Sequence, residues 1–374
     1  MKKVLIPFLL LIPVLTSAQD SLRTGVKYGI LPVLSFNSDD GVFIGGEVKR
    51  YDYRGAQPFK SFTRIAVNYK TDGAFSAGIY RDEVDIFGTD IRVGWDAFST
   101  QNFNNYYLGN TDEIEFDRDR FDTTSFYSFK SFRLNVGGAT RFPISREGGT
   151  NRFDFKTGLR FVYETPWGTP ESRFINSQNI EGSDGAFLTL LDIGLVLERR
   201  NSEFRAQRGY QLSTGFKYAP PGISTHHTLE NYFLGLGFLP LTRKIPITLA
   251  SRVSFQNTVG KTPYWFTPFL GGGTSLRGYM YRRFTSDNAL SYTIEVRSWL
   301  IKVPFKNIEI GANIFLDGGR VFSNDNWSEV FINHNITLGF GGVMAIFTPD
   351  YILKYDIGFS EDGIGIYLGT GYSF

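Results

Sequence analysis

Apolar and polar residues alternate with a period of two along most of the chain. In the segment RFDFKTGLRFVYE, the apolar residues Phe153, Phe155 and Phe161 share one face of an extended chain, whereas Arg152 and Asp154 share the other. Alternation of this kind predicts β-strands with one apolar face. Sixteen strands are predicted, and they begin near Val26, Val42, Ser61, Phe75, Asp90, Ser125, Arg152, Ala186, Tyr210, Leu229, Thr248, Leu290, Asn307, Ile336, Tyr351 and Gly363.

Strand length and loop length indicate where this sheet resides. Most predicted strands run about ten residues, as membrane-crossing strands do (~9–11), whereas soluble strands average ~5–6. A soluble β-sandwich also alternates, but it gives no regular order of long and short connections. Long connections follow only odd-numbered strands, at residues 99–124, 165–185, 260–288 and 319–335, while FGTD, PLTRKIP, VPFK and TPD follow even ones. We therefore expect a 16-stranded antiparallel transmembrane β-barrel with long extracellular loops and both termini periplasmic.

Composition and the N-terminus agree with this expectation. Aromatic residues make up 16% of the chain and glycines number 41, which suits aromatic girdles and turns. Lys2 and Lys3 precede an apolar run that ends before Thr16-Ser17-Ala18, so residues 1–18 are predicted to be a signal peptide. Residues 19–374 then form one barrel domain, expected in the outer membrane of a Gram-negative bacterium and in contact with its lipid.

Several other functions are disfavoured by what the chain contains. It has no cysteine, so thiolate metal sites and disulfides are excluded, and its balance of 39 basic and 37 acidic residues predicts no nucleic-acid partner. His226 and His227 are adjacent, so they point opposite ways on an extended chain and form a poor metal chelate; His334 stands alone. We expect no metal, no cofactor and no enzymatic activity.

The segment GGGTSLRGY, from Gly271 to Tyr279, raises a choice between two roles for Arg277. Glycine-rich loops often bind phosphate, but such a loop requires a Lys-Ser/Thr pair that opens a helix, and here Leu276-Arg277-Gly278 follows instead. The other role is structural. Alternation along the twelfth and thirteenth strands turns Glu295 and Asp317 inward, and the planar guanidinium of an arginine suits carboxylate partners. An arginine in a loop folded into the lumen would then lock that loop to the wall.

The same loop resembles loop six of the BamA–TamA–FhaC superfamily of outer-membrane barrels, also called the bacterial surface antigen family. That family carries V/L-R-G-F/Y here, an F-x-D-x-G motif on the thirteenth strand and an acidic-basic pair on the twelfth. The matching residues are Leu276, Arg277, Gly278 and Tyr279; Phe315, Asp317 and Gly319; and Glu295 and Arg297. Phe374 also looks like the terminal aromatic signal that such barrels carry on the last strand.

The resemblance implies a barrel whose loop six folds into the lumen and is locked by Arg277, Gly278, Tyr279, Glu295 and Asp317. It also implies a role in insertion or translocation of polypeptide or lipid. Family members usually carry periplasmic POTRA domains before the barrel, whereas here the first predicted strand starts at Val26. We therefore expect a short form without POTRA domains that borrows a separate periplasmic partner protein.

The first and last predicted strands meet at a seam that contains strand-breaking residues. Pro32 lies in the first strand, and Gly363, Gly365, Gly369 and Gly371 lie in the last. Proline removes a ladder donor and glycine weakens a strand. One interpretation is a tolerated edge with room for inward side chains; the other is a weak seam that opens sideways to lipid. A passive pore for small solutes and a membrane anchor for a periplasmic partner remain the alternative functions.

Overall fold

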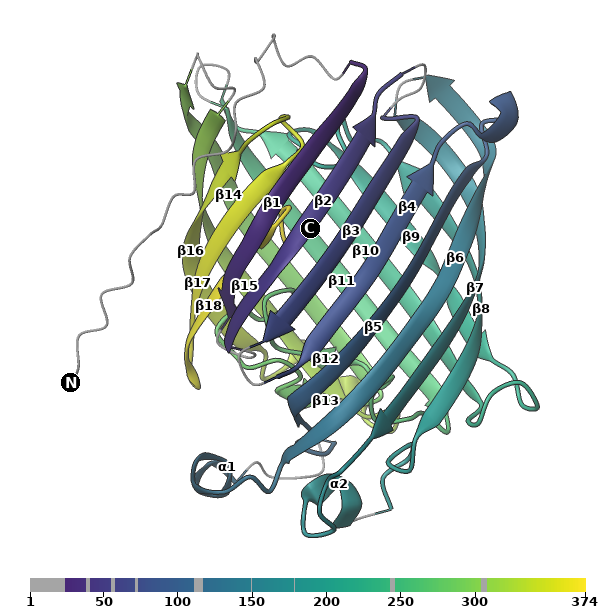
Figure 1. Ribbon diagram of the computed structural model, residues 1–374, viewed down its shortest axis with the longest axis vertical. Helices are drawn as coiled ribbons and strands as arrows, with labels where there is room; N and C mark the ends of the chain where they lie inside the picture. The colour runs from purple at the N-terminus through teal and green to yellow at the C-terminus, as the bar shows by residue number, and fades with distance from the viewer. Residues whose placement is uncertain are drawn as a thin grey trace, which may run out of the picture.

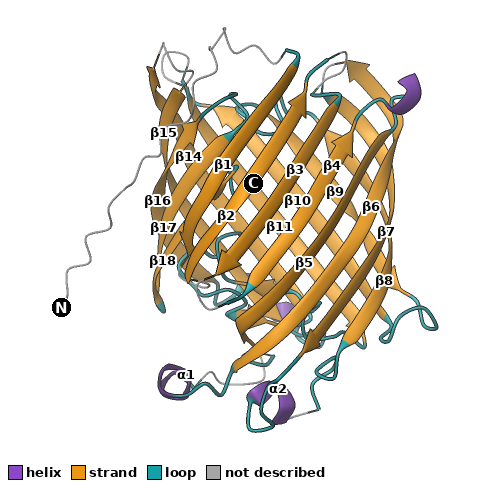
Figure 2. Ribbon diagram, viewed as in Figure 1, coloured by secondary structure: helices purple, strands orange, loops and turns teal. Residues whose placement is uncertain are grey.

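The computed structural model is a β-barrel of sixteen antiparallel strands, as the alternation predicts (Figure 1). The structure describes residues 24–37, 41–54, 58–70, 73–110, 117–148, 150–177, 179–242, 246–303 and 308–374. The predicted signal peptide and Asn307 lie outside these residues. Helices are confined to short segments at the barrel ends (Figure 2).

The barrel strands follow one another around the ring in chain order, except that β11 pairs with β14 across loop six. Their bounds are β1 Val26–Asn37, β2 Gly41–Asp52, β3 Ser61–Lys70, β4 Phe75–Glu83, β5 Arg92–Tyr106, β6 Ser128–Gly148, β7 Asn151–Pro166, β8 Ala186–Glu198, β9 Gly209–Ala219, β10 Thr228–Pro240, β11 Ile247–Gly260, β14 Asn288–Val303, β15 Ile308–Phe322, β16 Asn335–Ala345, β17 Ile352–Ser360 and β18 Gly363–Thr370. Two short strands, β12 (Phe269–Leu270) and β13 (Phe284–Thr285), form a separate hairpin within loop six.

Strand β5 extends further than the sequence pattern indicates. Residues 99–106 were expected to begin a long loop, but β5 continues to Tyr106 and pairs there with Ser128 of β6. The segment STQNFNNY lacks apolar alternation because it is mostly polar on both faces. Backbone pairing with β6, rather than burial of an apolar face, holds this end of the strand, so periodicity could not detect it.

The two faces of the wall differ as a membrane barrel requires. Ile314 and Ile294 point outward and are 62% and 49% exposed, whereas Asp317 and Glu295 point inward and are 0% and 2% exposed. A face with exposed apolar side chains all around the ring is stable only against lipid. No helix within the described parts of the chain is long and apolar enough to span a membrane.

The long connections gather at one end of the barrel. Helices α1 (Arg118–Thr123) and α2 (Phe174–Ser177) lie beyond the same end, below the barrel in Figure 1. The short helix η2 (Trp327–Phe331) belongs to the connection after β15, whereas η1 (Ile86–Gly88) lies in a turn that follows an even-numbered strand. This arrangement places α1, α2 and η2 on the extracellular side and η1 on the periplasmic side.

The C-terminal residues leave the wall, which corrects the expectation that Phe374 ends a strand. Strand β18 stops at Thr370, and Gly371 adopts a left-handed backbone with φ of 81°. Phe374 packs inside the barrel against Phe238 of β10, with ring centroids 6.4 Å apart. The alternation in GIGIYLGTGYSF predicts a longer strand, but packing of this aromatic ring against the inward-facing Phe238 overrides it.

Candidate functional site: loop six and the barrel seam

Loop six, residues 261–287, brings Arg277 from the extracellular side into the lumen. The guanidinium donates from Nε and Nη2 to the two carboxylate oxygens of Asp317 on β15, at 2.8 Å each. The backbone N–H of Arg277 also donates to Asp317, at 3.1 Å. The guanidinium Nη1 of Arg277 donates to Glu295 on β14 and to Asp356 on β17, both at 3.2 Å. One side chain therefore connects loop six to three strands of the wall.

The charges around Arg277 are balanced. Arg297 donates to Glu295 at 2.9 Å, and the Lys354 ammonium lies 3.2 Å from Asp356, so three cations face three carboxylates. Burial opposes the charge of the Arg277 guanidinium. Its hydrogen bonds with Asp317 and the neighbouring carboxylates more than offset this effect and raise the pKa of Arg277 above its usual value. The arginine is therefore permanently charged and fully used in protein contacts, which leaves it no free edge for a phosphate.

Phe315 completes the environment of the arginine. Its ring centroid lies 3.2 Å from the Arg277 guanidinium carbon, in a stacked cation–π contact. Phe315 and Asp317 are two residues apart on β15, so both point into the lumen. The spacing F-x-D thus supplies one stacking face and one bidentate acceptor to the same guanidinium.

Glycines let the loop backbone touch the wall. Gly278 has φ of 117°, a conformation that L side chains rarely adopt, and a Cβ at Gly358 of β17 would lie 2.3 Å from the Arg277 carbonyl oxygen. The Tyr367 hydroxyl of β18 accepts from the Gly278 N–H at 3.3 Å and donates to the Tyr279 carbonyl at 3.1 Å. The loop is therefore fixed to β17 and β18 through its backbone as well as through Arg277.

The structure thus brings together Arg277, Gly278, Tyr279, Glu295 and Asp317, the residues that the sequence singles out in this loop. Sequence reasoning missed Asp356 and Tyr367. The signal for Asp356 was present, because Tyr355 and Ile357 alternate with it and face outward. Tyr367 carried no such signal, since its function depends on where the loop backbone arrives.

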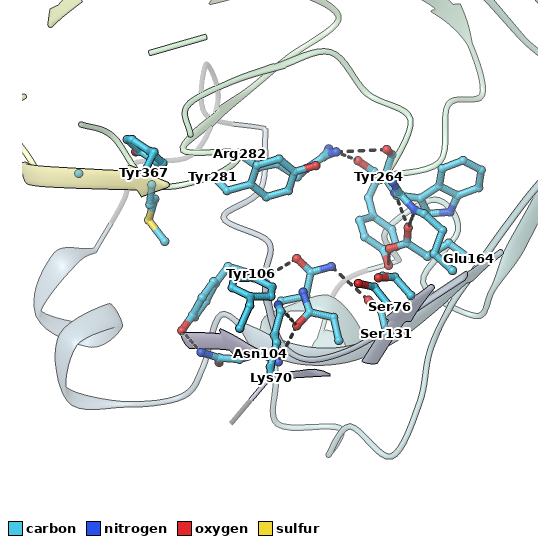
Figure 3. Close-up of a pocket in the computed structure, with 18 of the residues that line it drawn as sticks. Lys70, Ser76, Asn104, Tyr106, Ser131, Glu164, Tyr264, Tyr281, Arg282 and Tyr367 are labelled. Carbon is cyan, nitrogen blue, oxygen red and sulfur yellow. Dashed lines mark hydrogen bonds and ion pairs between the residues drawn. The ribbon is translucent and has the colours of Figure 1, made fainter. Parts of the chain in front are cut away.

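A cavity of about 500 Å³ lies between loop six and the inner face of β2 to β6 (Figure 3). Glu164 of β7 accepts a hydrogen bond from the Tyr264 hydroxyl at 2.9 Å, and Arg282 donates to the Tyr264 carbonyl at 2.5 Å. Tyr264 is therefore buried, in the loop that was expected to fold into the lumen. The remaining lining is mixed, with polar residues such as Lys70 and Asn104 beside apolar ones such as Phe98.

The seam between β1 and β18 has little backbone pairing. Among the described residues, Asn37 and Tyr367 are the one residue pair between these strands, whereas Leu353 to Ser360 of β17 pair with β18 along its length. Continuing the register from Asn37 and Tyr367 places Leu34 beside Thr370, where β18 ends. Residues 26–33 of β1 therefore have no strand beside them on the seam side within the described chain.

The strand-breaking residues have different local settings. Pro32 is exposed and lies in the unpartnered part of β1, where a proline protects an open edge. A Cβ at Gly365 would lie 2.5 Å from the Tyr367 hydroxyl, so this glycine makes room for the loop-six contact. Gly363 and Gly371 have positive φ at the two ends of β18, and Gly369 has only Lys354 nearby. Packing and turns thus account for Gly363, Gly365 and Gly371, while Pro32 marks the open edge.

Side chains bridge the seam at its periplasmic end, where the backbone does not. Tyr351, in the turn before β17, donates to Glu47 of β2 at 3.0 Å, and its ring lies against Gly29 of β1. Tyr53 donates to Asp350 of the same turn at 2.8 Å. These contacts can separate without disrupting a β-ladder.

The histidines take no part in this site. His226 lies 3.1 Å from Glu181 in an extracellular connection, and His334 contacts the Tyr292 ring near β16. Among the described residues, no group of three or more histidine, aspartate and glutamate side chains is arranged to hold a metal ion.

Comparison with known proteins identifies the fold and the family. The structure is similar to BamA from Haemophilus ducreyi lacking POTRA domains 1–3, with a TM-score of 0.57 and 13% identity over 93% of this chain and 70% of that one. It is similar to CdiB from Escherichia coli (TM-score 0.62, 12% identity, 93% of this chain and 62% of that one). CdiB from Acinetobacter baumannii gives a TM-score of 0.51 at 12% identity, covering 94% of this chain and 66% of that one.

These likenesses concern the fold, and the chain spans 62% to 70% of the length of those three structures. A search of curated protein sequences found no match. The model of the Omp85 superfamily domain matches residues 62–374, which include the loop-six motif and all but the first two barrel strands. The chain is an outer-membrane β-barrel protein that belongs to the Omp85 superfamily.

Proposed function

We propose that this barrel assists the insertion or translocation of polypeptide or lipid at the outer membrane by opening its β1–β18 seam. The observation that carries the proposal is that one residue pair joins β1 and β18 in the part of the chain that the structure describes. Every other pair of neighbouring strands is joined by a long ladder. The seam is therefore the place where the wall can part with the fewest broken hydrogen bonds.

Loop six has a supporting role in this proposal. It contacts β18 through Tyr367 and β17 through Gly358, so it holds the C-terminal side of the seam in position from inside. The N-terminal side is held by the Tyr351–Glu47 and Tyr53–Asp350 contacts. Opening then consists of separating these side-chain contacts, while β1 stays paired with β2 and loop six still holds β18.

The passive pore and the membrane anchor are the alternative functions. A pore requires an open lumen, and loop six occupies part of it here. An anchor requires a stable periplasmic partner, and the similarity to BamA and CdiB identifies no such partner for this chain. A separate periplasmic partner that delivers the client remains part of the proposal, and co-purification from native membranes would identify it.

The proposal is tested with the purified protein in liposomes. We expect the protein to accelerate the folding of an unfolded outer-membrane barrel client relative to protein-free liposomes, as measured by the heat-dependent gel shift of the client. A variant that undocks loop six, Arg277→Ala, should slow this reaction. If neither client folding nor lipid exchange between leaflets exceeds that of protein-free liposomes, the proposal is wrong; large steady single-channel currents would then favour the pore.

A further inference from the structure

The turn between β8 and β9, residues 199–208, folds into the periplasmic mouth of the barrel. We call this segment the inner turn. The pair Asn201 and Arg208 closes it, because the Asn201 N–H donates to the Arg208 carbonyl at 3.1 Å and its side chain accepts from the Arg208 N–H at 3.1 Å. It follows β8, an even-numbered strand, and three of its consecutive residues contact three different parts of the wall.

Glu203 attaches the inner turn to β5. Its two carboxylate oxygens accept from the Arg92 guanidinium at 2.6 and 2.8 Å. Arg92 also donates to Asp82 of β4, at 2.6 Å from Nη2. The side chains of Glu203 and Arg92 are 12% and 8% exposed, so this bidentate pair is largely withdrawn from water.

Phe204 and Arg205 attach it elsewhere. The Phe204 ring packs among Tyr51, Phe59 and Phe62 at the adjoining ends of β2 and β3, with centroids 5.2 to 5.7 Å apart. Arg205 forms an ion pair with Glu309 of β15, and its guanidinium carbon lies 3.6 Å from the Trp299 ring centroid of β14. Strands β5 and β15 lie on opposite sides of the sixteen-strand ring, so the inner turn spans the mouth.

The C-terminal residues fill the space beside it. Ala206 belongs to a buried cluster with Leu236, Phe238 and Ala250, against which Phe374 packs. Arg297 lies 4.4 Å from the Phe374 ring centroid. The inner turn and this segment together cover the inward faces of β10, β11 and β14.

We propose that the inner turn is a second plug, which closes the periplasmic end of the lumen independently of loop six. Its anchors, Arg92 and Glu309, lie at the periplasmic ends of their strands, whereas loop six is held by other wall residues, Asp317 foremost. Ion flow through the barrel therefore requires release of both plugs. This inference concerns the lumen and does not depend on whether the seam opens.

The test measures single-channel current in planar bilayers for variants that release loop six, the inner turn, or both. Arg277→Ala releases loop six, and Glu203→Ala with Arg205→Ala releases the inner turn. We expect the combined variant to conduct in large steady steps and Arg277→Ala alone to conduct at least tenfold less. Glu147→Gln in the Arg277→Ala background is the matched control, because it breaks the exposed Arg199–Glu147 pair at the base of the same turn and should add no current.

Equal conductance of Arg277→Ala and the combined variant would overturn the second plug, as would a folded combined variant that does not conduct. A second measurement serves if the combined variant does not fold. Ala250→Cys lies beneath the inner turn, and the chain has no other cysteine. Its reaction with a bulky impermeant maleimide should be slow in the otherwise native protein and should accelerate in Glu203→Ala with Arg205→Ala. Unchanged labelling would contradict the proposal.

Discussion

At the scale of single residues, the interior of this barrel is organised by arginines that reach across the lumen. Arg277 serves three carboxylates from three strands and stacks on Phe315. Arg297 and Lys354 pair with Glu295 and Asp356, whereas Asp317 forms its ion pair with Arg277. Removing one member of a buried ion pair costs ~3–5 kcal/mol, because its partner is left unpaired.

Arg277→Ala should therefore weaken the docking free energy of loop six by about 3 kcal/mol. The barrel itself should remain folded and heat-modifiable. Proteolysis of loop six in folded protein measures the undocking. Arg277→Lys should rescue only in part, since an ammonium lacks the fork that engages Asp317 in a bidentate manner. In a double-mutant cycle with Asp317→Ala, we expect a coupling energy above about 1 kcal/mol.

The matched control is Arg283→Ala, which removes the more exposed ion pair between loop six and Asp362. Partly exposed pairs contribute about 0–1 kcal/mol, so this variant should change proteolysis little. Strictly additive effects of Arg277→Ala and Asp317→Ala would show that their contact contributes nothing to docking.

Much of this site follows from the sequence because alternation fixes which side chains face inward. Glu295 and Asp317 were placed correctly by that rule, and Asp356 obeys it too. The inner turn could not be predicted, since Glu203 meets Arg92, 111 residues away, and Arg205 meets Glu309, 104 residues away. No local period encodes such contacts. The same holds for Phe374, whose alternation predicts a strand while packing against Phe238 draws it inward.

At the scale of elements, the barrel has two kinds of closure: ladders in the wall and side-chain contacts at its mouth. The inner turn illustrates how the second kind responds to pH. Burial opposes the charge on Glu203, but Arg92, Arg141 and Arg200 outweigh it and lower the pKa of Glu203 to about 2 from an ordinary 4.5. Asp82 lies on the far side of Arg92. A depressed pKa stabilises the closed turn fully above 4.5, and this stabilisation is lost as pH falls toward 2.

Current through Arg277→Ala should therefore stay low from neutral pH to about 4.5 and rise as the pH falls further. The measurement is open probability in planar bilayers as a function of pH. Glu203→Gln in the same background removes the titrating group, so its current should depend far less on pH in this interval. A pH profile identical in the two proteins would show that another group controls the response.

At the scale of the whole molecule, an even number of strands returns the chain to the side on which it started. The long connections with α1, α2 and η2 then face the cell exterior, and the turn with η1 faces the periplasm (Figure 1). Because the chain contains no cysteine, single cysteines report this topology cleanly.

Asn326→Cys and Thr89→Cys are both at exposed positions, in the connection after β15 and in the turn after β4. In intact cells, an impermeant maleimide should label Asn326→Cys and leave Thr89→Cys unlabelled until the outer membrane is permeabilised. Tyr264→Cys should remain slow in both conditions, because Tyr264 is a buried residue of loop six. Labelling of Thr89→Cys in intact cells, with Asn326→Cys silent, would reverse the orientation.

The weak β1–β18 seam links a single residue pair to the behaviour of the whole barrel, because the proposed function depends on opening at this seam. A disulfide between Phe36→Cys and Leu368→Cys, one step along the register from Asn37 and Tyr367, would fix the seam. Directly opposed strand residues have Cα separations within the range that a disulfide spans. Ile357→Cys with Ile366→Cys is the matched control, because it joins β18 to β17 across an intact ladder.

Client insertion by these two cross-linked proteins, with and without reductant, tests the central claim most directly. We predict that both fold and that the β17–β18 cross-link leaves insertion unchanged. The β1–β18 cross-link should abolish insertion until a reductant restores it. Full insertion by the oxidised β1–β18 protein would contradict the account, because it would show that the barrel acts without opening its seam.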